Sequence, residues 1–127
     1  MNYEKLNVKL KELKIEDFIW IIYIGIIVLS WYSNNLERKY FIFNDKLSKE
    51  KYRKIMIFIF SILIIVYTYF LNDSYKSIKN TKFNDSKSKK DLTKLSFIGS
   101  LLVFLSGIIF LYIAIKDEDI NVEIAFN

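Results

Sequence analysis

Side chains that commonly do chemistry are scarce in this sequence. It contains no Cys and no His, which removes the usual thiolate nucleophile, the commonest metal ligand and the commonest general base. Its three glycines, Gly25, Gly99 and Gly107, are too far apart to form a phosphate-binding loop. The acidic run at 117–119 crowds carboxylates together, but such a run is more typical of a solvated tail than of a divalent-cation site. We therefore expect no catalytic residue, no metal site, no cofactor and no enzymatic activity.

Charged residues make up 26% of the 127-residue chain, yet they are absent from the stretches 18–36, 55–71 and 95–115. As helices, the first stretch covers about 28 Å and the third about 31 Å, close to the ~30 Å hydrocarbon core of a bilayer. In a short soluble chain, three such helices would leave nothing to cover them. We therefore predict an all-α membrane protein, a single integral membrane domain over 1–127 with three transmembrane helices in a small bundle.

Four charged segments flank the expected spans. Residues 1–17 place apolar side chains at helical spacing beside lysines, which predicts an amphipathic helix on an anionic leaflet. Residues 37–54 and 72–94 are expected to be basic loops, and 116–127 an acidic tail. The N-terminal segment also carries acids, and no small-residue cleavage site follows it, so we do not expect a secretory signal peptide. The N-terminal segment and the second loop together hold slightly more Lys and Arg, which predicts a cytoplasmic N-terminus and an outside C-terminus.

Several residues at the span boundaries are suited to lipid headgroups. Trp20 and Trp31 lie near the two ends of the first span, where an amphipathic ring can sit at the membrane–water interface. Lys51, Arg53 and Lys54 precede the second span and would meet phosphates, each contributing about 1 kcal/mol near an anionic surface. We therefore expect the lipid bilayer, through its anionic headgroups, to be a binding partner.

The helix starts and the C-terminal tail carry local patterns. Ser48 resembles an N-cap for the second span, and Ser88 with Asp91 resembles a capping box for the third. The tail alternates apolar and polar residues, which is a β-strand pattern carried by Ile120, Val122, Ile124 and Phe126. We therefore expect a short strand-like C-terminal tail, either frayed or added to the sheet edge of a partner.

Small residues gather on one face of the third span. At 100° per residue this helix-packing face contains Ser96, Gly99, Ser100, Val103, Gly107 and Ala114, with Gly99 at its edge. Small side chains let another helix backbone approach closely inside a membrane. This face is expected to pack within the bundle, and packing against a partner or a second copy is the alternative.

Two hypotheses for the function follow from these features. The first is a small multi-pass membrane protein that acts by helix packing and by contact with lipids or an unidentified protein partner. The second is a self-assembling pore or membrane-disrupting effector, whose polar lining would include Ser61, Thr68 and Ser106. Proton relays and ion pathways use intramembrane charges, and the expected spans have none.

Three further features concern the family, nucleic-acid binding and the source of the composition. In size and span number the chain is similar to three-span phage holins, but its acidic tail differs from their basic cytoplasmic tail, so we do not assign it to that family. Lysines in the loops are interleaved with acids and accompany no nucleic-acid-binding module, so no nucleic acid is expected as a partner. The abundance of Ile, Lys and Asn is typical of an AT-rich bacterial genome.

Overall fold

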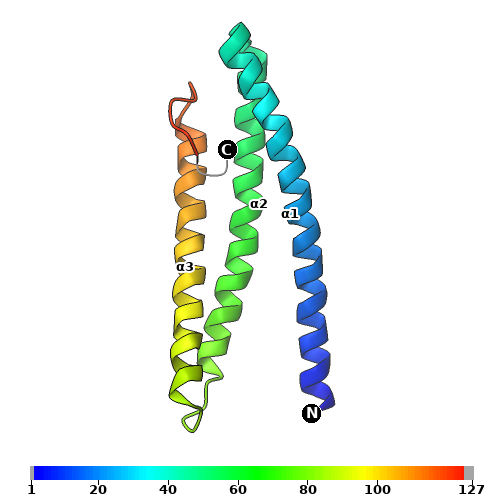
Figure 1. Ribbon diagram of the computed structural model, residues 1–127, viewed down its shortest axis with the longest axis vertical. Helices are drawn as coiled ribbons and strands as arrows, with labels where there is room; N and C mark the ends of the chain where they lie inside the picture. The colour runs from blue at the N-terminus through cyan, green and yellow to red at the C-terminus, as the bar shows by residue number, and fades with distance from the viewer. Residues whose placement is uncertain (1, 125–127) are drawn as a thin grey trace.

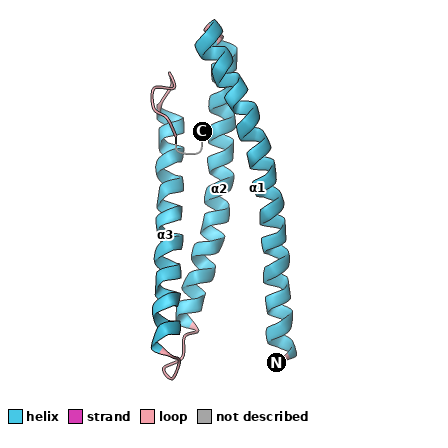
Figure 2. Ribbon diagram, in the orientation of Figure 1, coloured by secondary structure: helices cyan, strands magenta, loops and turns pink. Residues whose placement is uncertain are grey.

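Three long α-helices joined by short turns make up the fold (Figures 1 and 2). The computed structural model describes residues 2–124, and within them the helices are α1 (Tyr3–Phe43), α2 (Lys46–Lys79) and α3 (Lys87–Lys116). Residues 2–124 contain no strand, so the predicted all-α class is confirmed. At about 1.5 Å per residue the helices measure roughly 61, 51 and 45 Å, longer than the apolar stretches they contain.

Helix α1 runs without a break from the amphipathic N-terminal segment through the uncharged stretch to residue 43. The Asn2 side chain caps its start by accepting a hydrogen bond from the Glu4 backbone N–H at 3.1 Å. Asn44 ends it in the left-handed conformation with φ of 52°, which Asn tolerates better than most residues. No Pro interrupts the sequence, so the charged residues that follow the uncharged stretch continue the helix instead of forming a loop.

The connection between α1 and α2 is only Asn44 and Asp45, and the predicted basic loop at 37–54 is therefore wrong. Asp45 is the N-cap of α2 and accepts from the Leu47 backbone N–H at 3.2 Å. The Ser48 hydroxyl donates to the same carboxylate at 2.8 Å, so Ser48 supports the cap but is not the predicted cap itself. This hydroxyl is the largest cause of a lowered pKa of Asp45.

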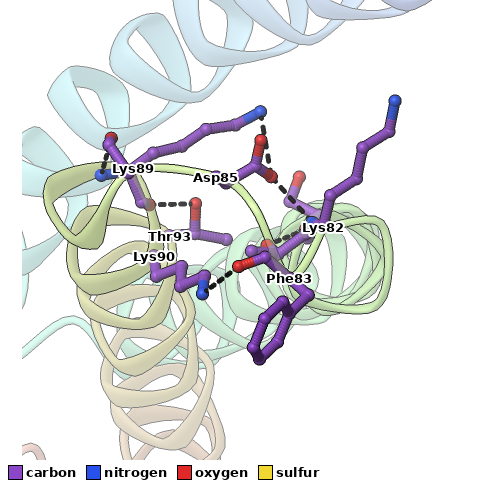
Figure 3. Close-up of polar contacts among 9 residues, drawn as sticks. Lys82, Phe83, Asp85, Lys89, Lys90 and Thr93 are labelled. Atoms are coloured by element: carbon purple, nitrogen blue, oxygen red, sulfur yellow. Dashed lines mark hydrogen bonds and ion pairs between the residues drawn. The ribbon is translucent and has the colours of Figure 1, made fainter.

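A compact polar turn at 80–86 joins α2 to α3 (Figure 3). The Asp85 carboxylate accepts from the Lys82 backbone N–H at 2.7 Å and pairs with the Lys89 ammonium at 3.4 Å. Ser86 caps α3 by accepting from the Lys89 backbone N–H at 3.2 Å. The Lys82 N–H is the main cause of a lowered pKa of Asp85. The predicted loop at 72–94 is thus mostly helical.

The tail after α3 folds back on itself and forms no strand within 117–124. The Asp117 carboxylate accepts from the backbone N–H groups of Asn121 at 2.9 Å and Val122 at 2.7 Å, closing a turn. Ile120 takes a φ of 54°, a left-handed conformation that breaks the alternation a strand requires. The predicted strand is therefore wrong for 117–124, and Phe126 lies outside the described residues.

Helix α2 is central and packs against both neighbours, whereas α1 and α3 have no backbone approach within 8 Å in the described residues. The three helices run antiparallel in sequence order, and α1 leans away from α2 and α3 toward its N-terminus (Figure 1). The buried core lies toward the α1–α2 turn and includes Leu36, Met56, Ile59, Phe60, Leu63, Ala114 and Ile124.

Helices α2 and α3 are long and apolar enough to cross a membrane. Only 28% of the most apolar window of α2 and 11% of that of α3 is buried inside the protein. In a soluble protein a core helix of this composition would be mostly covered, because exposed apolar area is unfavourable in water. Most of the apolar surface of α3, and part of that of α2, therefore faces outward.

The two serines at the start of α3 give a direct test of its boundary. We expect Ser86→Ala to lower the free energy of unfolding by about 1 kcal/mol, because it removes the N-cap acceptor. Ser88→Ala is the matched control and should change stability little, since the Ser88 side chain has no hydrogen bond within the described residues. Urea unfolding of the purified variants in detergent, followed by circular dichroism, measures both values. A larger loss for Ser88→Ala would contradict the observed cap.

Candidate helix-packing site

Helices α2 and α3 approach each other closely at Gly107, one of the six residues of the predicted packing face. Gly107 is buried beneath the Tyr67 ring of α2. A Cβ added there would lie 3.1 Å from Tyr67 Cδ2 and 3.4 Å from Ile64 Cγ1, closer than side chains normally approach. A larger residue would therefore fit there only if the Tyr67 ring shifted, and small residues at such positions are typical of close helix pairs in membranes.

The face of α3 that packs on α2 is rotated by about 55°, roughly half a residue at 100° per residue, from the predicted face. Most of its buried and half-buried side chains follow alternating spacings of four and three: Thr93, Phe97, Ser100, Phe104, Gly107, Leu111 and Ala114. Leu101, Phe110 and Ile113 are half-buried beside them. The alternating spacing is the heptad period of left-handed helix pairs. Two aromatic contacts support it, Tyr75–Phe97 with ring centroids 6.0 Å apart and Phe60–Phe110 at 5.7 Å. The interface therefore combines small with large side chains.

The predicted packing residues consequently have different environments. Gly107 and Ala114 are buried and Ser100 is half-buried, so the structure brings these three to the α2–α3 interface. Ser96, Gly99 and Val103 are exposed and lie at its edge. There they line a groove of about 300 Å³ whose other walls are Tyr23 of α1 and Tyr67 and Phe70 of α2.

A second groove lies between α1 and α2 and measures about 530 Å³. Its walls are almost entirely apolar and include Trp20, Ile27, Met56, Phe60 and Leu63. Trp20 stands at its rim, 65% exposed, with its ring edge-on to Tyr23 at 5.7 Å. An open groove with apolar walls is suited to an apolar group rather than to a polar ligand.

The hydroxyl groups considered as a pore lining are satisfied within their own helices. Ser61 donates to the Ile57 carbonyl and Thr68 to the Ile64 carbonyl, both at 2.7 Å. Ser106 donates to the Leu102 carbonyl at 2.9 Å. All three residues are exposed on the outer surface of the single chain. Because each hydroxyl bonds the carbonyl four residues earlier, none needs another polar partner in an apolar surrounding.

Of the basic residues expected at lipid headgroups, Arg53 has an internal contact. Its Nη2 donates to the Ile115 carbonyl at 2.9 Å, satisfying one of the carbonyls left open at the end of α3. Lys51 and Lys54 are exposed, as is Trp31 with 71% of its surface accessible. No local sequence pattern indicates this role of Arg53, because its carbonyl partner lies on a helix distant in sequence.

The C-terminal tail closes the end of the bundle, and the sequence analysis also missed this contact. Ile124 is only 6% exposed and packs in the core with Leu36 of α1, while Asp119 pairs with Lys49 of α2 at 3.2 Å. Burial, followed by the negative charge of Glu123, raises the pKa of Glu37. A hydrogen bond from Tyr52 opposes this rise.

The crowded acids of the tail have structural contacts of their own. Asp117 closes the turn and Asp119 forms the ion pair with Lys49. Between residues 2 and 124 there is no group of three or more acidic side chains arranged to hold a metal ion. The site therefore consists of packing surfaces, two apolar grooves and a docked tail.

No family model, curated protein or solved structure significantly matches the chain.

Two glycines of the predicted face make a matched test of the observed packing. We expect Gly107→Leu to lower the free energy of unfolding by about 1–3 kcal/mol, because the new side chain would overlap Tyr67. Gly99→Leu should be tolerated, since an added Cβ there meets nothing within 4 Å. Denaturant unfolding in detergent measures the difference. Equal losses would indicate that the face of α3 predicted from small residues, rather than the observed one, contacts α2.

Proposed function

We propose that the protein is a multi-pass membrane protein whose three helices all cross the bilayer, and that it acts without catalysis. Its work is helix packing and contact with anionic headgroups and a protein partner. The observation that carries this proposal is the apolar surface that α3, and in part α2, presents to the outside. Soluble monomers rarely expose contiguous apolar patches larger than a few hundred Å², so a lipid surrounding explains what a soluble state does not.

The alignment of the uncharged stretches supports α1 as the third span. Measured from the α1–α2 turn, the stretch 18–36 of α1 and the stretch 55–71 of α2 begin at similar distances along their helices, about 10–15 Å. Two antiparallel neighbours therefore place their uncharged stretches at the same level. The α1 side chains on the outer face are mostly accessible, among them Phe18, Ile21, Ile24, Ile27 and Val28, each at least 60% exposed.

The arrangement of the ends supports the proposed topology. The N-terminus and the 80–86 turn lie at one end of the molecule, and the α1–α2 turn and the tail lie at the other (Figure 1). The first end carries slightly more Lys and Arg, including Lys82, Lys87, Lys89 and Lys90 around the turn. By the positive-inside rule we place this end in the cytoplasm.

The second candidate function is a pore formed by self-assembly of several copies. One observation favours self-association. Ser96, Gly99 and Val103 form a strip of small side chains left uncovered beside an open groove. Such a strip lets a further helix approach closely. A pore would bring the exposed hydroxyls of Ser61, Thr68 and Ser106 together only in an assembly of several chains.

Single-cysteine labelling tests the topology, because the natural chain has no Cys. In intact cells an impermeant maleimide should label Lys51→Cys and Asn121→Cys, but should label Tyr3→Cys and Ser88→Cys only after the membrane is opened. Labelling of Tyr3→Cys together with Lys51→Cys from one side would show that α1 does not cross. Recovery of the untreated protein in the soluble fraction without detergent would remove the membrane proposal entirely.

The mass of the intact assembly in detergent and a liposome flux assay separate the two candidates. Packing within one chain or with a different partner predicts no ion leak from liposomes containing the purified protein alone. Leakage that grows with protein concentration, together with a mass of several copies, would establish the pore instead. The matched variant is Gly99→Leu, which fills the uncovered strip of α3 and should reduce self-association without disturbing Gly107.

A further inference from the structure

The tail is the one described segment that packs among the ends of all three helices. Its Ile120 and Ile124 belong to the same apolar cluster as Leu36 of α1, Met56 of α2 and Ala114 of α3. In Figure 1 the tail rises from the end of α3, turns and comes back down beside that end. The α1–α2 and α2–α3 pairs are each joined by a turn at one end, while α1 and α3 share no turn and have no close backbone approach. The tail therefore braces the two outer helices.

Three contacts hold the tail in place. Ile124 is almost fully buried, which removes its apolar surface from water. The Asp119 carboxylate pairs with Lys49 at 3.2 Å, and Asp117 holds the turn by accepting the backbone N–H groups of Asn121 and Val122. The Asp119 side chain is 69% exposed, so this ion pair contributes little and is weakened by salt.

Three features of the docked tail oppose these contacts. Ile120 is β-branched and takes a left-handed φ of 54°, a conformation that strains such a residue. Arg53 Nε is buried and has no hydrogen-bond partner in the described structure, beside a cavity of about 20 Å³ under the tail. Leu36 and Ile124 share the buried cluster, and their chain neighbours Glu37 and Glu123 thereby bring two negative charges toward each other. The net free energy that holds the tail docked is therefore a small difference between these opposing effects.

We propose that residues 117–124 are a releasable strap that ties the end of α3 to the α1–α2 hairpin, and that the charges of Glu37 and Glu123 control its release. This inference concerns regulation and does not depend on the proposed membrane function. With both carboxylates ionised, repulsion favours the released strap. With a proton on Glu37, the repulsion disappears and the buried Ile124 holds the strap docked.

The groups around Glu37 determine the direction of the pH response. The tail contributes the Glu123 carboxylate and α2 contributes the Tyr52 hydroxyl, whose hydrogen bond partly stabilises the charged form. On α1 the adjacent Arg38 and Lys39 are exposed, and on α2 Lys49 and Arg53 contact Asp119 and the Ile115 carbonyl. Burial first and the Glu123 charge second raise the pKa of Glu37, and the docked tail supplies that charge, so the docked state binds the proton more tightly. Docking is therefore favoured below the ordinary glutamate pKa and lost as the pH rises through the raised value.

Distance measurements between two spin labels test the strap in the full chain. Cysteines replacing Ser88 and Asn121 place one label at the start of α3 and the other on the tail, about 45 Å apart along a rigid helix. In detergent we expect a narrow distance distribution at about pH 4 and a broad one at about pH 7.5. Between these values the ratio of docked to released molecules should fall by at most about tenfold per pH unit, as linkage to one proton requires.

Matched variants identify the groups responsible. Glu37→Gln and Glu123→Gln should each keep the distribution narrow at both pH values, because either one removes the repulsion. Glu118→Gln, on an exposed acid of the same tail, should retain the wild-type response. Ile124→Ala should broaden the distribution at both pH values. An unchanging wild-type distribution would overturn the proposal, and so would a response abolished equally by Glu118→Gln.

Discussion

Unbroken backbone hydrogen bonding along each helix is the constraint on which the rest of this structure depends. A backbone group without a partner is costly wherever water is excluded, so an apolar segment is stable there only as a continuous helix. The chain meets this constraint without any Pro and with turns confined to 44–45 and 80–86. Its caps are Asn2, Asp45 and Ser86, which satisfy N–H groups that the helices cannot.

The distribution of charge predicted the helical class and the apolar stretches, but not the ends of the helices. Lys and Glu are good helix formers, so residues 37–43 and 46–54 extend α1 and α2 although their charge suggested a loop. The serines predicted as N-caps of α2 and α3 were likewise not the residues that cap these helices. Ser48 and Ser88 both lie inside the first helical turn, because Asp45 and Ser86 precede them and accept the first N–H bonds. Several residues could cap each helix, and packing decides among them.

The packing site was partly predictable for a similar reason. Small residues indicated which side of α3 meets another helix, and Gly107 and Ala114 are buried there. The exact rotation depends on large side chains such as Phe97 and Phe104, which the search for small residues ignored. Contacts between distant segments, including Arg53 with the Ile115 carbonyl and Lys49 with Asp119, leave no local pattern in the sequence. They follow only from the antiparallel order that places the start of α2 beside the end of α3.

The antiparallel order of the helices also gives the two ends of the molecule different numbers of contacts between helices. At the α1–α2 turn the core cluster, Arg53 and the tail connect all three helices. Toward the other end α1 leans away, and the groove beside Ser96 and Gly99 stays open. Motion that separates α1 from α3 therefore meets least resistance at the open end, where fewer buried contacts must be broken. Helix α2 links the two ends, since among the helices described it is the one that packs against both α1 and α3.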